Sequence, residues 1–232
     1  QLSKVDSSQT VAILKSHYSH QQTVQSAMDA CIRLNAKVFI LELPSFNHPM
    51  AMGNDMTAYC GDTALTGNLA AQRALESVDL IIDTMMLLHS PEQEQILKTG
   101  TRILLAVEPP EVLARILPTL EDKVRVQTAE KYLKQAKSMH VTSKAGTDFY
   151  APLGMYPAVT EYGFADEAGR WDHWPSGFLF TWPNENTAEG KLVLDVGDIL
   201  LPFKMYVREK VTLDIEKGFI TNIHGGFEAE YL

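Results

Sequence analysis

The chain has 232 residues, 45% of them hydrophobic, which suffices for one large domain or two modest ones with buried cores. Its formal net charge is −9 and no cluster of lysine and arginine interrupts the acidic balance, so we expect neither nucleic acid nor an anionic membrane as a partner. Cys31 and Cys60 are the only cysteines, which is typical of a reduced cytoplasmic protein, and no apolar run reaches the roughly 18 residues of a membrane span.

The first half of the chain alternates short apolar runs with amphipathic stretches. The runs, each typical of a buried strand, are residues 11–14, 38–41, 80–82 and 103–107. Helical stripes separate them, and two more helices are expected around residues 112–117 and 124–136. Continuous apolar strands separated by helices indicate a parallel sheet that is covered on both faces. We therefore predict a three-layer α/β domain of Rossmann-like type over residues 1–138.

The character of the sequence changes after residue 139. Strands are predicted at residues 140–142, 192–194, 211–215 and 219–221, and the last two flank a Lys-Gly turn that predicts a hairpin. No further long helix is expected. We therefore predict that residues 139–232 form a β-rich α+β domain, and that this domain is incomplete because its hairpin edges lack partner strands.

One stretch gathers a carboxylate, an imidazole and the three tryptophans of the chain. These residues are Glu161, Trp171, His173, Trp174 and Trp182. Loop-like sequence seldom contains so many large aromatic residues without a purpose, so the stretch predicts an aromatic-walled pocket for a small ring, with proton-transfer groups beside it. A well-packed loop over a sheet, with the tryptophans in the core, explains the same residues equally well.

His89 stands between a predicted strand and a predicted helix. Ser90 as N-cap, Pro91 in the first helical position and Gln93 three residues after the cap form a capping-box pattern. The positive end of the helix dipole disfavours an imidazolium there, so the ring would stay neutral and available as a base. The alternative is a histidine that only packs at the helix entrance.

Common signatures of cofactor and metal sites are absent from the sequence. It contains no G-x-G-x-x-G after the first strand, no Walker loop and no G-x-S-x-G elbow. It also contains no H-E-x-x-H and no C-x-x-C, and no histidine and carboxylate cluster has metal-ligand spacing. The motifs alone therefore assign no metal ligand in this chain.

Longer strings are more informative than these motifs. Residues 51–62, 88–95, 160–163, 171–183 and 202–204 make the chain resemble the 2,5-dihydroxypyridine 5,6-dioxygenases along essentially its whole length. These are ring-cleaving enzymes of bacterial nicotinate breakdown, similar in fold to the leucyl aminopeptidases of the aminopeptidase T type. Those peptidases carry a metal-binding glutamate in a P-x-G-E motif, and the matching position here is Phe178. A phenylalanine cannot bind a metal ion, which argues against a two-metal peptidase.

The resemblance implies a mononuclear non-haem Fe(II) enzyme that converts 2,5-dihydroxypyridine and O2 to N-formylmaleamate. Such iron is typically held by two histidines and a carboxylate. In this family those ligands belong to the C-terminal portion, so we expect them beyond Leu232 and none within the chain. The resemblance implies proton-transfer roles for His89, Glu161 and His173. It is also the basis for expecting substrate contacts from Leu88, Trp171, Trp174 and Trp182, and a homo-oligomer.

Two rival functions remain at this stage. One is a metal-dependent, aminopeptidase-like hydrolase on the same scaffold, which would release amino acids without O2 uptake. The other is a non-catalytic fragment of either enzyme. Because the expected iron ligands lie outside the chain, we predict that the 232-residue chain alone is inactive.

Overall fold

The computed structural model describes residues 2–44, 63–87, 90–203 and 205–232. It divides into two compact units, each formed by two separate stretches of the chain. The first unit contains Gln1–Val126 and Glu161–Phe178, and the second contains Gln127–Thr160 and Leu179–Leu232. This division differs from the sequence ranges 1–138 and 139–232, because a late segment returns to the first unit. No helix in the described part of the chain is both long and apolar enough to cross a membrane.

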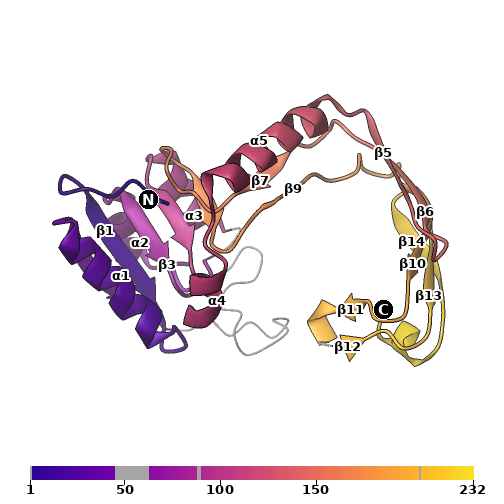
Figure 1. Ribbon diagram of the computed structural model, residues 1–232, viewed down its shortest axis with the longest axis horizontal. Helices are drawn as coiled ribbons and strands as arrows, with labels where there is room; N and C mark the ends of the chain where they lie inside the picture. The colour runs from indigo at the N-terminus through magenta and orange to yellow at the C-terminus, as the bar shows by residue number, and fades with distance from the viewer. Residues whose placement is uncertain (1, 45–62, 88–89, 204) are drawn as a thin grey trace. The chain divides into compact units, whose positions relative to one another are not determined.

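The first unit is built on a five-stranded parallel sheet in the order β2-β1-β3-β4-β8 (Figure 1). Its strands are β1 (Thr10–Lys15), β2 (Lys37–Glu42), β3 (Leu80–Asp83), β4 (Arg102–Leu105) and β8 (Trp171–His173). Residues 11–14 of β1 are fully buried, so both faces of the sheet are covered at this strand, as its continuous apolar run predicts. The edge strand β2 was also predicted to be buried, but it is more open, with Phe39 36% and Ile40 43% exposed. The predicted α/β class is confirmed.

Helices α1 (Gln21–Arg33), α2 (Leu69–Glu76), α3 (Pro91–Lys98) and α4 (Pro110–Arg115) connect these strands. One core cluster combines Leu75 of α2 and Ile96 of α3 with Ala12, Ile81 and Ile103 of the sheet. Burial of these side chains provides the main stabilisation of the unit. Helix α5 (Leu120–Gln135) follows, and the boundary between the units falls inside it.

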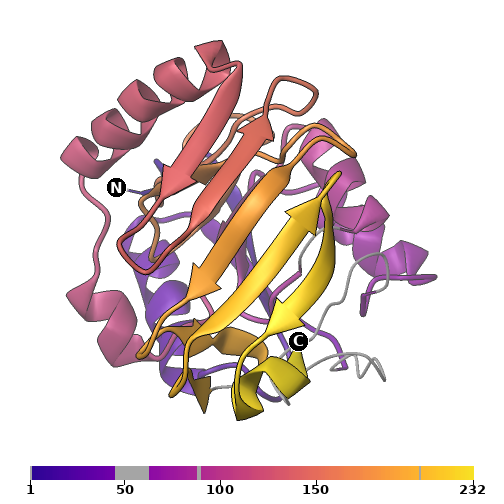
Figure 2. The ribbon, with the colours of Figure 1, turned by 90° about the vertical axis from the view of Figure 1, so that its right-hand side faces the viewer.

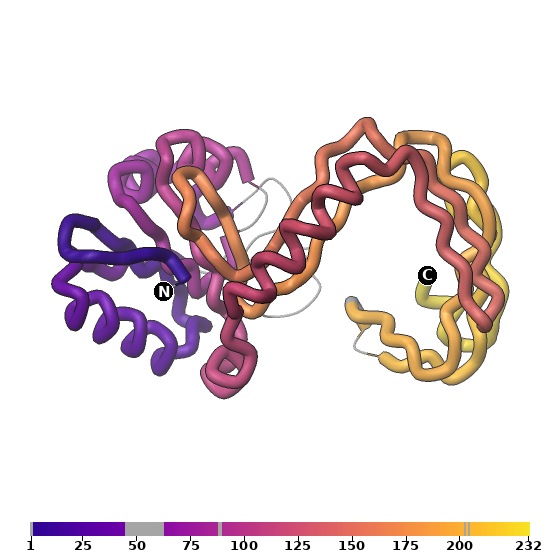
Figure 3. Tube along the Cα trace, turned by 45° about the horizontal axis from the view of Figure 1, so that its top comes forward, coloured from indigo at the N-terminus to yellow at the C-terminus, as the bar shows by residue number. Residues whose placement is uncertain are grey.

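Strand β8 is the one strand of this parallel sheet, among the described residues, that sequence reasoning missed, because residues 160–183 read as loop. The structure pairs β8 in parallel with β4, placing Trp171 beside Ile103 and His173 beside Leu105. In Figure 3 this returning segment, drawn in orange, lies beside the magenta strands of the first unit. Three residues are too few to show a hydrophobic period, and the central one is Asp172, a charged residue that does not suggest a buried strand.

The second unit contains a five-stranded antiparallel sheet in the order β14-β13-β10-β6-β5 (Figure 2). Its strands are β5 (Ser138–Thr142), β6 (Asp148–Pro152), β10 (Glu189–Leu194), β13 (Val211–Glu216) and β14 (Phe219–His224). Lys217 and Gly218 both have positive φ and close the predicted β13–β14 hairpin. Leu200, Val207, Val211 and Leu213 form a core cluster.

Short elements complete the chain. β11 (Ile199–Leu200) pairs with β12 (Met205–Tyr206), and 3-10 turns span η1 (Leu201–Phe203) and η2 (Phe227–Tyr231). A second two-stranded sheet joins β7 (Val159–Glu161) to β9 (Phe178–Phe180), and the chain passes between the units within these two strands.

Candidate functional site

Two of the predicted proton-transfer residues, Glu161 and His173, lie side by side in the first unit. His173 ends β8 at the carboxyl edge of the parallel sheet, where ligands bind in open α/β folds. Its Nδ1 atom lies 3.7 Å from Oε2 of Glu161, whose side chain is only 9% exposed. The carboxylate can therefore orient the imidazole and compensate a positive charge on it. This leaves the other ring nitrogen for a ligand.

Several buried polar atoms of this segment have no partner among the described residues. They are Nε2 of His173, Nε1 of Trp171 and Oγ of Ser176. A buried donor or acceptor that stays unpaired costs free energy, so such atoms are normally satisfied by protein, water or ligand. The backbone N–H of Gly177 donates to the carbonyl of Glu161, which keeps the neighbouring Ser176 close to Glu161. These three atoms therefore mark the segment around His173 as a candidate binding region.

The other predicted residues are found in different surroundings. Trp171 packs against the core cluster of the first unit. It can therefore belong to the core and still form part of a pocket wall. Nε1 of Trp174 donates to the carbonyl of Ile116 at 2.9 Å, which fixes that indole. Trp182 belongs to the second unit. Leu88 and His89 lie outside the described residues.

The described residues on either side of positions 88 and 89 are held firmly. Ser90 caps α3 by accepting the N–H of Gln93 at 3.0 Å, which confirms the predicted N-cap. The side-chain amide of Gln93 donates to the carbonyl of Leu87 at 2.8 Å. The N–H of Leu87 in turn donates to Oδ2 of Asp83.

Asp83 is a buried carboxylate that sequence reasoning overlooked. It ends β3 and shares a register row with Leu105 and His173, so it lies on the same face and at the same edge of the sheet as His173. Burial raises the pKa of Asp83 to about 6, and the backbone N–H groups of Met85, Leu87 and Met86 oppose this rise, as does His173. The signal that could have found it is an aspartate that closes an apolar strand at the carboxyl edge.

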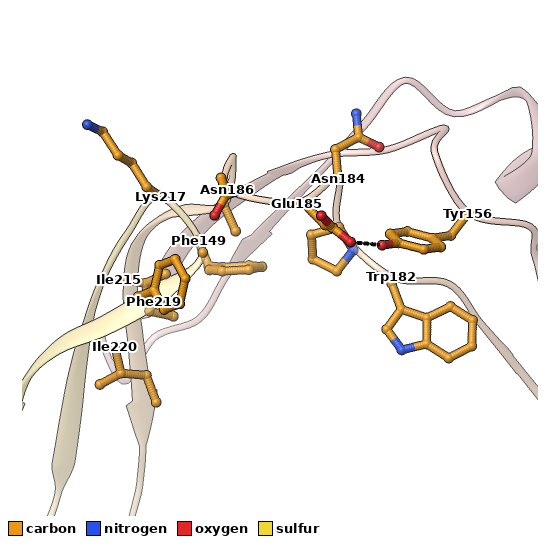
Figure 4. Close-up of a pocket in the computed structure, with 13 residues that line it drawn as sticks. Phe149, Tyr156, Trp182, Asn184, Glu185, Asn186, Ile215, Lys217, Phe219 and Ile220 are labelled. Carbon is orange, nitrogen blue, oxygen red and sulfur yellow. Dashed lines mark hydrogen bonds between the residues drawn. The ribbon is translucent and has the colours of Figure 1, made fainter. Parts of the chain in front are cut away.

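A separate groove of about 760 Å³ lies in the second unit (Figure 4). Phe149, Tyr156, Trp182 and Phe219 contribute aromatic surface to it, and Tyr156 donates a hydrogen bond from its hydroxyl to Glu185. Of the described residues that line the groove, none is a histidine or an aspartate. The groove therefore offers apolar contact area but no imidazole for proton transfer.

Comparison with known proteins settles the family. The model of the family NicX, 2,5-dihydroxypyridine 5,6-dioxygenase, matches residues 1–232. The chain belongs to this family. A 2,5-dihydroxypyridine 5,6-dioxygenase of Pseudomonas putida KT2440 is 79% identical over 231 residues, which are 100% of this chain and 66% of the relative. The chain thus spans less than two thirds of the length of this curated relative.

Solved structures agree with the fold. The structure of the 2,5-dihydroxypyridine dioxygenase from Pseudomonas putida KT2440 matches with a TM-score of 0.95 and 79% identity, over 99% of this chain and 66% of that one. Wild-type AmpT from Thermus thermophilus matches with a TM-score of 0.60 and 13% identity, over 96% of this chain and 68% of that one. The second likeness concerns the fold alone and confirms the predicted relation to the aminopeptidase T scaffold.

Membership of a dioxygenase family implies a metal, and the described residues can be tested for a place to hold it. Within residues 2–44, 63–87, 90–203 and 205–232, no three side chains of His, Cys, Asp and Glu gather closely enough to hold an ion. A facial iron site needs two histidines and a carboxylate. The described residues therefore do not form such a site, and Glu161 with His173 is a pair rather than a ligand set.

The raised pKa of Asp83 predicts a pH-dependent contribution to stability in this dioxygenase-family chain. Because the pKa rises from 3.8 to about 6 on folding, the folded state holds this proton more tightly than the unfolded state. The contribution is therefore full below pH 3.8 and is lost as the pH rises through about 6. We expect wild type to lose about 2 kcal/mol between pH 4 and pH 7 relative to Asp83→Asn. Urea unfolding of both chains across this range measures the difference, and parallel curves would refute it.

Proposed function

We propose that the protein containing this chain opens the ring of 2,5-dihydroxypyridine by inserting both atoms of O2, giving N-formylmaleamate. Family membership supports the reaction class, and 79% identity to a relative of that name supports the substrate. The observation that carries the proposal is the pairing of Glu161 with His173, in which Nε2 of His173 is buried and lacks a partner among the described residues.

In this proposal the chain's own residues bind the ring and move protons. Nε2 of His173 accepts a proton from a ring hydroxyl, and Glu161, 3.7 Å from Nδ1, stabilises the imidazolium that forms. His89 is a second proton donor and acceptor. Leu88, Trp171 and Trp174 bind the ring through their apolar surfaces.

We further propose Fe(II) as the cofactor, which would supply the activation of O2. Among the described residues no set of side chains fits a facial iron site. As the family resemblance implies, its ligands are proposed to come from the part of the family's length that this chain does not cover. A cytoplasmic location and a homo-oligomeric assembly remain predictions from the sequence.

An oxygen-electrode assay tests this function. It compares the 232-residue chain with a chimera in which this chain replaces the matching segment of the Pseudomonas putida relative. With Fe(II) and 2,5-dihydroxypyridine, we expect the chimera to consume O2 in equal amount to the substrate and to release N-formylmaleamate. The 232-residue chain alone is expected to consume none. Release of amino acids from leucyl peptides without O2 uptake would instead favour a hydrolase.

A further inference from the structure

Asp172 lies at the centre of β8, between Trp171 and His173, and its side chain is fully buried. Successive residues of a strand point to opposite faces, so the Asp172 carboxylate lies on the other face of the sheet from His173. Its Oδ1 atom accepts the N–H groups of Tyr162 at 3.0 Å, Gly163 at 2.7 Å and His173 at 2.8 Å. One oxygen therefore receives three backbone donors.

The second carboxylate oxygen of Asp172 binds the guanidinium of Arg170. Both Nε, at 2.9 Å, and Nη2 of Arg170 donate to Oδ2. The same guanidinium lies 3.6 Å from the centre of the Tyr162 ring, and its Nε also donates to the carbonyl of Phe164. The fully buried Asp172 and the partly buried Arg170 thus form an ion pair. Together they hold residues 162–164 through backbone hydrogen bonds and through the contact with the Tyr162 ring.

A buried carboxylate is costly, and it is retained only where its partners compensate it. Burial raises the pKa of Asp172, while Arg170 and the N–H groups of Gly163 and His173 oppose the rise. The compensation comes from groups of two separate segments. Asp172 therefore links these segments as well as being stabilised by them.

The segments that Asp172 joins are those that carry the proton-transfer pair. Tyr162 directly follows Glu161, and His173 is bonded through its own N–H. We propose that Asp172 is a positioning residue that sets the separation between Oε2 of Glu161 and Nδ1 of His173. Its catalytic consequence rests on the proposed ring cleavage, whereas the positional claim stands on the hydrogen bonds alone.

A purely structural brace would have the same bonds, so the test needs a matched control. Asp166 offers one, because it is also a nearly buried carboxylate of the first unit, bound to Lys123 at 2.8 Å and Lys4 at 3.2 Å. Its described bonds go to neither Glu161, nor Tyr162, nor His173. Lys123 also lies 4.9 Å from the centre of the Tyr162 ring, but Asp166 accepts none of the backbone N–H groups that bind Asp172. Asp166→Asn therefore removes a comparable ion pair while leaving those backbone bonds in place.

The kinetic test uses the chimera with Asp172→Asn. An amide cannot accept three N–H groups on one side while it balances Arg170 on the other. A displacement of about 1 Å typically lowers turnover by about 100-fold, and we expect that loss in kcat with KM changed by less than about 3-fold. Adding Glu161→Gln should then lower kcat by only about a further 10-fold, instead of the roughly 10³-fold it costs alone, because the pair is already separated. Asp166→Asn should leave kcat unchanged. Combined with Glu161→Gln, it should therefore give the same kcat as Glu161→Gln alone.

Hydrogen–deuterium exchange provides a readout that does not depend on activity. Asp172→Asn is expected to speed amide exchange at Tyr162, Gly163 and His173 by at least about 10-fold, and Asp166→Asn is not. If Asp172→Asn does not fold, Arg170→Lys replaces it, because it keeps the charge but loses the paired donors and the stacking on Tyr162. Unchanged kcat in the variant that folds, or multiplicative effects with Glu161→Gln, would overturn the proposal. If the wild-type chimera showed no O2 uptake, the proposed ring cleavage would be refuted. The hydrogen–deuterium exchange result would then decide whether Asp172 positions Glu161 and His173.

Discussion

Glu161→Gln in the chimera is expected to lower kcat for ring cleavage by about 10³-fold. Glutamine has the same shape as glutamate but carries no negative charge. It cannot compensate an imidazolium on His173, whose Nδ1 lies 3.7 Å from the carboxylate. Because Glu161 is almost fully buried, water cannot replace the missing charge. Steady-state kinetics of O2 uptake measure the change.

Glu185→Gln is the control for this prediction. Glu185 also accepts a hydrogen bond from a neighbouring side chain, Tyr156, but it lies in the second unit and lines the apolar groove. Its substitution should leave kcat within about 2-fold of wild type. If Glu161→Gln retained most of the activity while His173→Gln abolished it, the histidine would act without the carboxylate and the pair would lose its assigned role.

Gly163→Ala is expected to destabilise the first unit by about 4 kcal/mol. Gly163 has φ +80°, a conformation that side chains with a Cβ adopt only under strain. A Cβ at this position would also lie 2.5 Å from Cβ of Pro118 and overlap its ring. The N–H of Gly163 makes the 2.7 Å bond to Asp172, so the backbone cannot move aside freely. Urea unfolding of the 232-residue chain measures the loss.

Gly100→Ala separates the two causes of this expected loss. Gly100 lies in the same unit with φ +95°, but a Cβ there would meet nothing within 4 Å. We therefore expect a cost of about 1–2 kcal/mol from the backbone conformation alone. Equal losses for the two substitutions would mean that the overlap with Pro118 relaxes without cost.

The sequence was sufficient to predict most of the fold, because the relevant signals are local. Continuous apolar runs predicted β1 to β4, and the Lys217-Gly218 turn predicted the β13–β14 hairpin. Strand β8 escaped prediction because its three residues are defined by pairing with β4, some 68 positions earlier in the chain. No local pattern encodes such a pairing.

The candidate site was predictable to a similar degree. Glu161 and His173 stood out by residue type and by resemblance, and the structure places them 3.7 Å apart. Asp83 and Asp172 did not stand out as buried carboxylates, since an aspartate in sequence suggests a solvated surface. Their burial depends on backbone donors that only the folded chain directs at them, such as Leu87 for Asp83, and Tyr162 and Gly163 for Asp172.

The central claim is that this chain supplies the proton-transfer pair while the iron ligands lie elsewhere. Iron content after anaerobic loading with Fe(II) and desalting tests it most directly. We expect the chimera, with or without Glu161→Gln and His173→Gln, to retain iron in equal amount to protein, and the 232-residue chain to retain almost none. Stoichiometric iron in the 232-residue chain, or its loss from the chimera on either substitution, would contradict the claim.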